Sequence, residues 1–486
     1  MKFGLEKWIF LIIVSSVIAG CEVGPDFHSP APPLTNRYTD IPVAQQTVSA
    51  PTPGGESQII HYGQAIPAQW WVLFHSTPLN CLIAQGIERN PNLLAAQAAL
   101  RVAGQNLRAG EGALFPSINL TGSGVRQRVS GDEFGIPAAP SQTYNLYQIA
   151  FNVSYTLDAF GGIRRKIEAL GAQVDFQRYE WDAAYLTLTS NIVTTAITDA
   201  SLRAQIAATV DLINEQQQIL QIVQQQFKLG GVSQGIVLTQ ATLLAQTQSS
   251  LPPLQKNLAQ NRDALAVLAG DLPSRSRLPP FHLSDLNLPR NIPLGVPCAL
   301  VRQRPDVQAA EALLHAASAN IGVATANLWP KITLTANYGW AATLINQLFE
   351  RQKSVWLYGL EFMQPLFQGG ALIAQRRAAI AAFDQAFWQY QQTVLTAFQN
   401  VADSLHALEI DAVALRDTAQ AENAARANFV LTRKQYQLGG VSFLTLLTAE
   451  QQYQQTRLSR VKAEAQRYLD TAALFQSLGG GWQQER

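Results

Sequence analysis

The sequence contains one arrangement of motifs twice, and this internal duplication limits the fold more than any other feature. Pro116, in Leu-Phe-Pro-Ser-Ile-Asn-Leu-Thr, matches Pro330, in Leu-Trp-Pro-Lys-Ile-Thr-Leu-Thr, and the two prolines are 214 residues apart. Pro91 and Pro305 are separated by the same distance. Each copy in such a repeat is one supersecondary unit. We expect a first repeat over residues 78–270 and a second over residues 298–478, joined by a Pro-rich connector over residues 271–297.

Each repeat contains one long segment without proline, from Ile163 to Leu229 and from Ala371 to Leu438. A continuous helix of about 67 residues is a rod of roughly 100 Å, which no compact domain accommodates. Both segments end in Leu-Gly-Gly-Val-Ser, which predicts a turn between two helices. A returning helix of about half that length follows each turn, and a helical segment of similar length opens each repeat; the expected ranges are 234–268, 443–478, 78–113 and 298–327.

Between the opening helix and the long helix, each repeat has two segments in which apolar and polar residues alternate. Tyr147 to Leu157 and Trp356 to Phe362 show this pattern most clearly, and it predicts β-strands with one apolar face. We expect β-hairpins at about 116–158 and 330–366. Strands of about ten residues with an aromatic-rich face suit the wall of a transmembrane barrel. A half-buried sheet of a soluble domain has the same alternation, whereas a helical solenoid would leave the strands unexplained.

Prolines and glycines mark the ends of these strands. Pro116 and Pro330 cannot continue a helix but can begin a strand. The pairs Gly161-Gly162 and Gly369-Gly370 allow the sharp bend from the second strand into the long helix. These six residues are the predicted strand–helix bends.

Four strands per chain cannot close a barrel, and an open sheet edge in lipid leaves backbone groups unpaired. Oligomerisation around a cyclic axis is therefore expected: two chains would give a filled or narrow barrel, and three would give a wider, twelve-stranded one. The predicted fold class is mainly α with a membrane β-barrel portion, built as an internally duplicated α/β hairpin-barrel.

Residues 1–20 have the order of a bacterial signal peptide, with Lys2 and Lys7 before an apolar run that is too short to span a membrane. Ile18-Ala19-Gly20-Cys21 follows and resembles the lipobox of bacterial lipoproteins, in which the thiol is acylated and becomes the new N-terminus. Cys21 is thus the expected lipidation site; a signal peptide with a chance Cys is the alternative. Residues 21–77 are rich in Pro, Gly, Ser and Thr and predict an extended arm, and residues 479–486 form a C-terminal tail.

The charged and metal-binding residue types exclude several classes of function. The 35 Lys and Arg nearly cancel the 34 Asp and Glu, which argues against nucleic acid as a partner. Three Cys and six scattered His suggest no metal site, and Met363 is the only Met in the mature chain, which disfavours metal export through thioethers. No catalytic motif is present, so we expect no enzyme and no cofactor except a covalent lipid on Cys21. For Cys81 and Cys298, buried free thiols are expected rather than a disulfide.

Over essentially its whole length the chain resembles the TolC-like outer membrane factors, specifically the NodT-type lipoproteins of resistance-nodulation-division (RND) efflux pumps. The resemblance rests on the lipobox and the two Pro motifs, together with three further stretches: Cys21-Glu22-Val23-Gly24-Pro25-Asp26-Phe27, Trp70-Trp71-Val72-Leu73-Phe74, and Leu294-Gly295-Val296-Pro297 with Arg302-Gln303-Arg304-Pro305-Asp306-Val307. Cys298 and Gln303 depart from the usual Ser and Arg.

This resemblance implies a homotrimer with a twelve-stranded outer membrane barrel, a helical tunnel in the periplasm, and an equatorial domain built from the arm, the connector and the tail. It also implies two protein partners, a periplasmic adaptor (membrane fusion) protein and a proton-driven inner membrane transporter of the RND type.

The family docks its adaptor and closes its tunnel at the helical tips, which here are Gly230-Gly231-Val232-Ser233 and Gly439-Gly440-Val441-Ser442. Many members close with rings of Asp and links of Arg just past the second turn, where this chain has Val441, Thr445 and Thr448. We therefore expect a gate formed by packing of Leu438, Val441, Leu444 and Leu447.

The function expected from these features is a passive conduit of a tripartite system that exports drugs or other small toxic compounds. A lipid-anchored periplasmic scaffold and a secretion duct of a type I system are the alternatives. The sequence does not identify the cargo, because a tunnel passes what its pump delivers.

Overall fold

The computed structural model describes residues 22–130 and 140–480; the predicted signal peptide, the lipidation site Cys21 and residues 481–486 lie outside these ranges. The described elements are, in chain order, β1 Ile59–Tyr62, η1 Trp70–Phe74, α2 Thr77–Arg89, α3 Pro91–Glu111, η2 Gly112–Leu114, β2 Ser117–Val129, β3 Gln142–Leu157, α4 Gly162–Lys228, α5 Gln234–Leu268, η4 Leu283–Asp285, β4 Asn291–Leu294, α6 Pro297–Gln303, α7 Pro305–Ala326, β5 Lys331–Ala342, η5 Ile345–Gln347, η6 Arg351–Lys353, β6 Ser354–Met363, α8 Ala371–Gln437 and α9 Phe443–Ser477.

The chain divides into two compact units. The first contains the described part of residues 1–29 together with residues 100–177 and 310–390, and the second contains residues 30–99, 178–309 and the rest of the chain from residue 391. The β-hairpins belong to the first unit, whereas the arm from residue 30 onward, the connector and the helical tips belong to the second.

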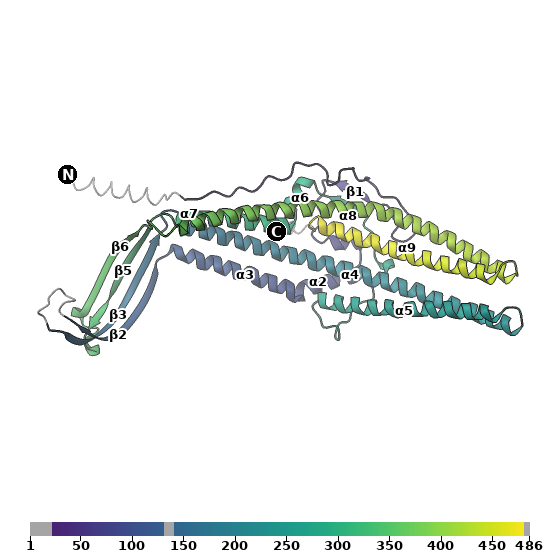
Figure 1. Ribbon diagram of the computed structural model, residues 1–486, viewed down its shortest axis with the longest axis horizontal. Coiled ribbons are helices and arrows are strands. Elements are labelled where there is room, and N and C mark those ends of the chain that lie inside the picture. The colour runs from purple at the N-terminus through teal and green to yellow at the C-terminus, as the bar shows by residue number, and fades with distance from the viewer. Residues whose placement is uncertain (1–21, 131–139, 481–486) are drawn as a thin grey trace. The chain divides into compact units, whose positions relative to one another are not determined.

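A four-stranded antiparallel sheet in the first unit joins the two repeats, with strand order β2-β3-β5-β6 (Figure 1). The pairing of β3 with β5 runs from Tyr147 opposite Ala342 to Leu157 opposite Ile332 without interruption. Large apolar side chains on one face of β6 are exposed, among them Trp356 at 66% and Tyr358 at 75%. An apolar face of this size indicates an interaction surface, because soluble monomers rarely expose one.

The segments expected as single opening helices are each divided in two. The first consists of α2 and α3, and the second of α6 and α7. The residues between them, Asn90 and Arg304, have extended ψ angles of 121° and 124°. A proline follows each of them, and the residue before proline is disfavoured in the helical conformation. The expectation of continuous helices over 78–113 and 298–327 was wrong for this reason.

The long helices α4 and α8 contain 67 residues each, and the returning helices α5 and α9 contain 35 each. The two returning helices differ in one respect, because α5 contains Pro252 and Pro253. Within the described ranges, no helix has the length and the continuous apolar character needed to cross a membrane.

In the second unit the arm packs on the connector and on α9. The short strand β1 of the arm pairs in parallel with β4 of the connector, a pairing that the sequence did not predict. Trp70 and Phe74 are fully buried, and the Trp70 ring lies 5.4 Å from that of Phe475. These aromatic residues form the core that joins the arm to the last helix.

The buried guanidinium of Arg467 on α9 fixes the arm to this core. It donates hydrogen bonds to the carbonyl oxygens of Gly54 at 2.9 Å and Glu56 at 3.1 Å, and to Gln58 Oε1 at 3.0 Å. The side chain of Gln58 in turn donates to Thr471 Oγ1 at 3.1 Å. The arm thus supplies acceptors for both terminal nitrogens of this guanidinium, whose burial without any partner would be strongly destabilising.

Candidate functional site

The predicted docking residues form two helix-to-helix turns with the same geometry. In the first, Gly230 has φ of +77°. Its N–H donates to the carbonyl of Phe227 at 2.9 Å, and the N–H of Gly231 donates to Gln226 at 2.8 Å. This pair of bonds is a Schellman motif, which requires the left-handed conformation that glycine adopts without strain.

The second turn repeats this pattern with Gly439 at φ +76° and bonds from Gly439 and Gly440 to the end of α8. It differs in its helix cap, because the hydroxyl of Ser442 accepts a hydrogen bond from Thr445 N at 3.2 Å, whereas the Ser233 side chain makes no such bond. Both glycine pairs and both serines are exposed, and Val232 and Val441 are half-buried.

The two turns are held together by a small apolar core. Ile219 and Val223 of α4 and Phe443 of α9 are buried there, and they are flanked by Val232, Ile236, Val237 and Tyr436. The Tyr436 hydroxyl also donates to Gln226 Oε1 at 2.7 Å, and its ring lies 5.7 Å from that of Phe443. We did not predict this tie. Its only sequence signal is that Tyr436 of the second repeat matches Phe227 of the first, so that the second copy has an extra hydroxyl.

The four candidate gate residues do not form one cluster within the chain. Leu438 and Leu444 are exposed at 86% and 68%, whereas Leu447 is buried in the chain at 7%. Val441 is half-buried. Leu438 and Leu444 are therefore the gate candidates available for contacts with another chain.

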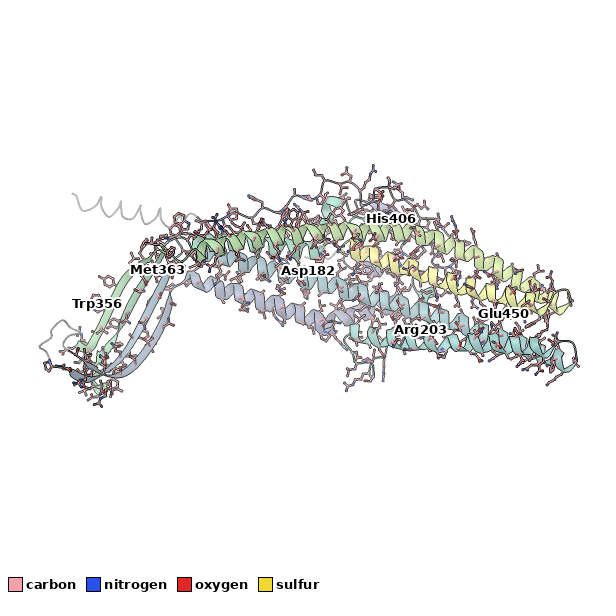
Figure 2. All side chains as sticks on the ribbon, viewed as in Figure 1. Asp182, Arg203, Trp356, Met363, His406 and Glu450 are labelled. Carbon is pink, nitrogen blue, oxygen red and sulfur yellow. The ribbon has the colours of Figure 1, made fainter. Side chains whose placement is uncertain are left out.

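A buried polar cluster lies beside the tips, around Glu450 of α9 (Figure 2). Glu450 is only 1% exposed, and Gln216 of α4 and Gln240 of α5 are fully buried. Burial raises the pKa of the Glu450 carboxyl to about 7, and the nearby charge of Glu215 acts in the same direction. The charge of Arg433 of α8 and the nearby side chain of Gln216 oppose this shift, and Gln454 Nε2 donates to Glu450 Oε1 at 3.3 Å. The carboxyl is therefore partly protonated near neutral pH.

The predicted strand–helix bends lie where the sheet meets the helices. Gly161, Gly369 and Gly370 have positive φ angles of 74°, 59° and 81°. Beside them Asp158 caps α4, because its carboxylate accepts from the backbone N–H groups of Ile163 and Arg164, each at 2.9 Å. Gly162 begins α4, and Pro116 and Pro330 directly precede β2 and β5. All six bend residues thus occupy element boundaries.

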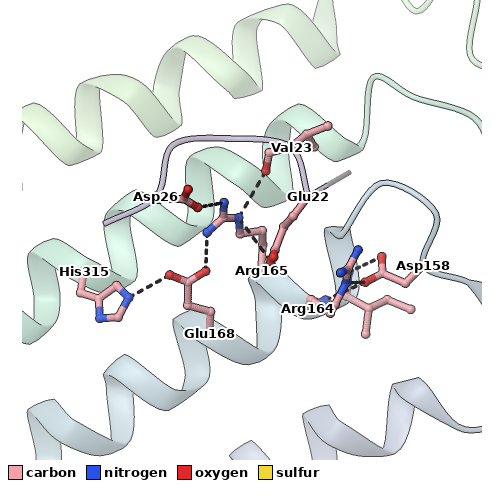
Figure 3. Close-up of polar contacts among 9 residues, drawn as sticks. Glu22, Val23, Asp26, Asp158, Arg164, Arg165, Glu168 and His315 are labelled. Atoms are coloured by element: carbon pink, nitrogen blue, oxygen red, sulfur yellow. Dashed lines mark hydrogen bonds and ion pairs between the residues drawn. The ribbon is translucent and has the colours of Figure 1, made fainter. Parts of the chain in front are cut away.

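The first described residues of the chain bind to a charged cluster at the start of α4 (Figure 3). Its centre is Arg165, which is 3% exposed. The guanidinium donates to Asp26 at 2.6 Å, to Glu168 at 2.8 Å and to the carbonyl of Val23 at 3.3 Å, and it lies 3.5 Å from Glu22. The hydrogen bond and the charge of Arg165 lower the pKa of Asp26.

His315 of α7 completes the cluster. Its Nε2 lies 2.8 Å from Glu168 Oε1, and its ring stacks on Phe27 with 4.4 Å between centroids. We did not predict a role for Arg165 or His315. The available signal was an asymmetry between the repeats, since Gly161-Gly162 is followed by Ile-Arg-Arg and Gly369-Gly370 by Ala-Leu-Ile.

Cys81 and Cys298 are free and exposed, so the expectation of buried thiols was wrong. Leu79, Leu82 and Ile83 form the buried face of α2, and Cys81 lies on the other side of that helix. Among residues 22–130 and 140–480, no group of His, Cys, Asp and Glu lies close enough together to hold a metal ion.

Comparison with known proteins identifies relatives over the whole chain. The family described as "Outer membrane efflux protein" matches residues 82–271 and 297–480. The pyoverdine export outer membrane protein OpmQ of Pseudomonas putida is 29% identical over 89% of this chain and 93% of its own length. The cation efflux system protein CusC of Escherichia coli is 28% identical over 97% of this chain and 98% of its own length.

Solved structures give the same result for the fold. The outer-membrane channel OprN superimposes with a TM-score of 0.85 at 26% sequence identity, covering 95% of this chain and all of that one. The CmeC outer membrane channel of Campylobacter jejuni has the same fold, with a TM-score of 0.82 at 19% identity over 96% of both chains.

Proposed function

This chain belongs to the outer membrane efflux protein family and is a passive channel rather than an enzyme, and on this basis we propose that it works as a homotrimer. Three copies would join their four-stranded sheets into a twelve-stranded barrel. The supporting observation is the sheet itself. It has two unpaired edges, β2 and β6, and a face of exposed aromatic and aliphatic side chains, which lipid would cover once the edges are paired.

The cargo we propose is drugs or other small toxic organic compounds. The relatives are named for pyoverdine, toluene, antibiotics and cations. The polar face of the sheet favours uncharged organic cargo, because amides and hydroxyls bond to one another across three strands. Asn337 Nδ2 donates to Asn152 Oδ1 at 2.5 Å, and Asn152 Nδ2 donates to Thr121 Oγ1 at 2.8 Å.

We further propose that the helical tips bind a periplasmic adaptor protein, through which the channel connects to an inner membrane transporter of the RND type. The two tips carry the same Gly-Gly turn, with exposed backbone and without charged side chains in the turns. The tie between Tyr436 and Gln226 holds the two hairpins in one arrangement. The adaptor would therefore meet two nearly equivalent docking points on each chain.

Acylation of Cys21 would anchor the N-terminus in the outer membrane. The residues that directly follow Cys21 support this proposal, because Glu22, Val23 and Asp26 bind Arg165 at the start of α4, next to the sheet. An acyl chain attached there would start close to the sheet that we place in the membrane. A lipid chain contributes about 0.8 kcal/mol for each buried CH₂ group.

The test uses the full-length protein in a strain that lacks its own efflux channels, together with the cognate adaptor and transporter. We expect outer membrane trimers, pores in planar bilayers, and restored resistance to organic toxic compounds. Cys21→Ala should lose acylation, and Cys81→Ala, which changes an exposed free thiol, serves as its matched control. A Cys21→Ala protein that is soluble without detergent and forms no pores would instead identify a periplasmic scaffold.

A further inference from the structure

The outer end of the sheet carries basic side chains on the same face as the apolar residues. Along β2, the residues that share a face are Ile118, Leu120, Gly122, Gly124, Arg126 and Arg128, because the pairing with β3 continues without a bulge from Ser117 to Val129. Ile118 and Leu120 are exposed at 67% and 58%, and both arginines are exposed as well. The face that would touch lipid therefore ends in two cations.

The distance along the strand places these arginines at the edge of the membrane. Eight residues separate Ile118 from Arg126, which corresponds to about 27 Å along a strand. With a strand tilt of about 40°, this is roughly 21 Å across the membrane, and the apolar band of such barrels is about 25 Å tall. Arg126 and Arg128 would thus lie at the level of the outer lipid headgroups.

Neither arginine forms an ion pair with another residue in the described part of the chain. Two further basic residues, Arg351 and Lys353, precede β6 at the same end of the sheet. Glu350 is the only acidic residue among the described residues 122–130, 140–150 and 338–358. Within the described residues this end carries an excess of positive charge, and Asp132 and Glu133 follow β2 in the segment 131–139, which lies outside them.

The two pairs lie at opposite edges of the sheet, because Arg126 and Arg128 are on β2, Arg351 and Lys353 directly precede β6, and β2 and β6 are the outer strands. In the trimer that we propose above, β2 of one copy pairs with β6 of the next. Each seam then brings Arg126 and Arg128 of one chain close to Arg351 and Lys353 of its neighbour. Arginine binds phosphate through two parallel hydrogen bonds, and a cluster of such side chains at a lipid-facing boundary matches a phosphorylated headgroup.

We propose that each seam between protomers binds a phosphate group of a phosphorylated glycolipid in the outer leaflet, with Arg126 and Arg128 as the main ligands. This inference rests on the proposed trimeric barrel. The lipid bridges two chains, so binding also stabilises the closed trimer by mass action.

The test measures binding of purified trimers in detergent to bis-phosphorylated lipid A, to the same lipid without its phosphates, and to phosphatidylglycerol, with native mass spectrometry as the readout. The double variant Arg126→Gln/Arg128→Gln should bind bis-phosphorylated lipid A about 25-fold more weakly, from roughly fivefold for each basic residue at an anionic membrane surface. The control Arg101→Gln/Arg108→Gln, which removes two exposed arginines of α3, should bind like the unaltered protein.

Equal binding of the two lipid A forms would overturn the proposal in favour of apolar contact alone. Equal binding of phosphatidylglycerol would overturn it in favour of a general anionic surface. The comparison of lipids needs only the unaltered protein, so it decides the question even if the double variant fails to assemble. Single-channel recordings of the same preparation distinguish failure of the lipid site from failure of the proposed channel function. Pores without discrimination between the lipids refute the lipid site alone. Absence of trimers and pores refutes the proposed function as well.

Discussion

Replacing the buried carboxyl of Glu450 with an amide, Glu450→Gln, should remove a dependence on pH from the helical tips. Burial raises the pKa of this carboxyl from 4.5 to about 7. Between these values the folded tip keeps a proton that an unfolded tip has already released. The stability linked to this proton is complete below pH 4.5 and is lost as the pH rises through about 7.

The size of the effect follows from the two pKa values. A gap from 4.5 to about 7 corresponds to about 3 kcal/mol. This is an upper limit for local opening, because Arg433 and Gln216 stay near the carboxyl when only part of the tip opens. The Glu450→Gln variant should keep the free energy of tip opening nearly constant from pH 5 to pH 8, whereas the unaltered protein should lose up to about 2.5 kcal/mol over this range.

Hydrogen exchange of the amides of residues 443–454, corrected for the intrinsic pH dependence of exchange, measures this opening free energy. Glu88→Gln is the matched control, because the Glu88 side chain is 76% exposed and its replacement should leave the pH dependence unchanged. If the tips of the unaltered protein and of Glu450→Gln lose protection equally between pH 5 and pH 8, burial of Glu450 does not control their opening.

Three further substitutions test other parts of the molecule. Arg467→Met leaves carbonyl groups of the arm without their donor, so it should lower the stability of the folded protein by about 1–3 kcal/mol for each buried acceptor left unpaired and make the arm sensitive to proteases, as measured by thermal unfolding and limited proteolysis. Asp199→Asn removes the charge of a fully buried carboxylate that binds Arg203 and Arg262. We expect the free energy of unfolding to fall by about 3 kcal/mol, and an unchanged midpoint of thermal unfolding would contradict this. Gly322→Val places a side chain where a Cβ would already lie 2.7 Å from Arg165 Cγ and 3.0 Å from the Val23 carbonyl. Mass spectrometry after brief proteolysis should show cleavage within residues 22–29, and protection equal to that of the unaltered chain would count against this packing.

The elements that periodicity and repetition encode were predictable. The strands β2, β3, β5 and β6 follow from alternation of residue type, and the long helices follow from segments without proline between glycine pairs. The breaks in the opening helices also have a signal in the sequence, namely Pro91 and Pro305, because the residue before a proline is disfavoured in the helical conformation. The prediction of continuous helices overlooked this signal. The missed contacts are of another kind. Arg165 with Asp26, and Tyr436 with Gln226, join residues that are 139 and 210 positions apart, and residue pattern alone does not specify which distant side chains meet.

The position of Arg467 determines when the arm can fold. The arm comes early in the chain and is synthesised long before α9, yet its hydrogen-bond partner Arg467 lies 413 residues after Gly54. Closing such a long loop is slow compared with forming a helix. Until almost the whole polypeptide has been exported, residues 47–58 have no complete set of partners, so they stay available to chaperones or to proteases throughout secretion. A truncated product without α9 would leave this segment without its partners, so susceptibility to cleavage within residues 47–58 would distinguish unfinished chains from complete ones.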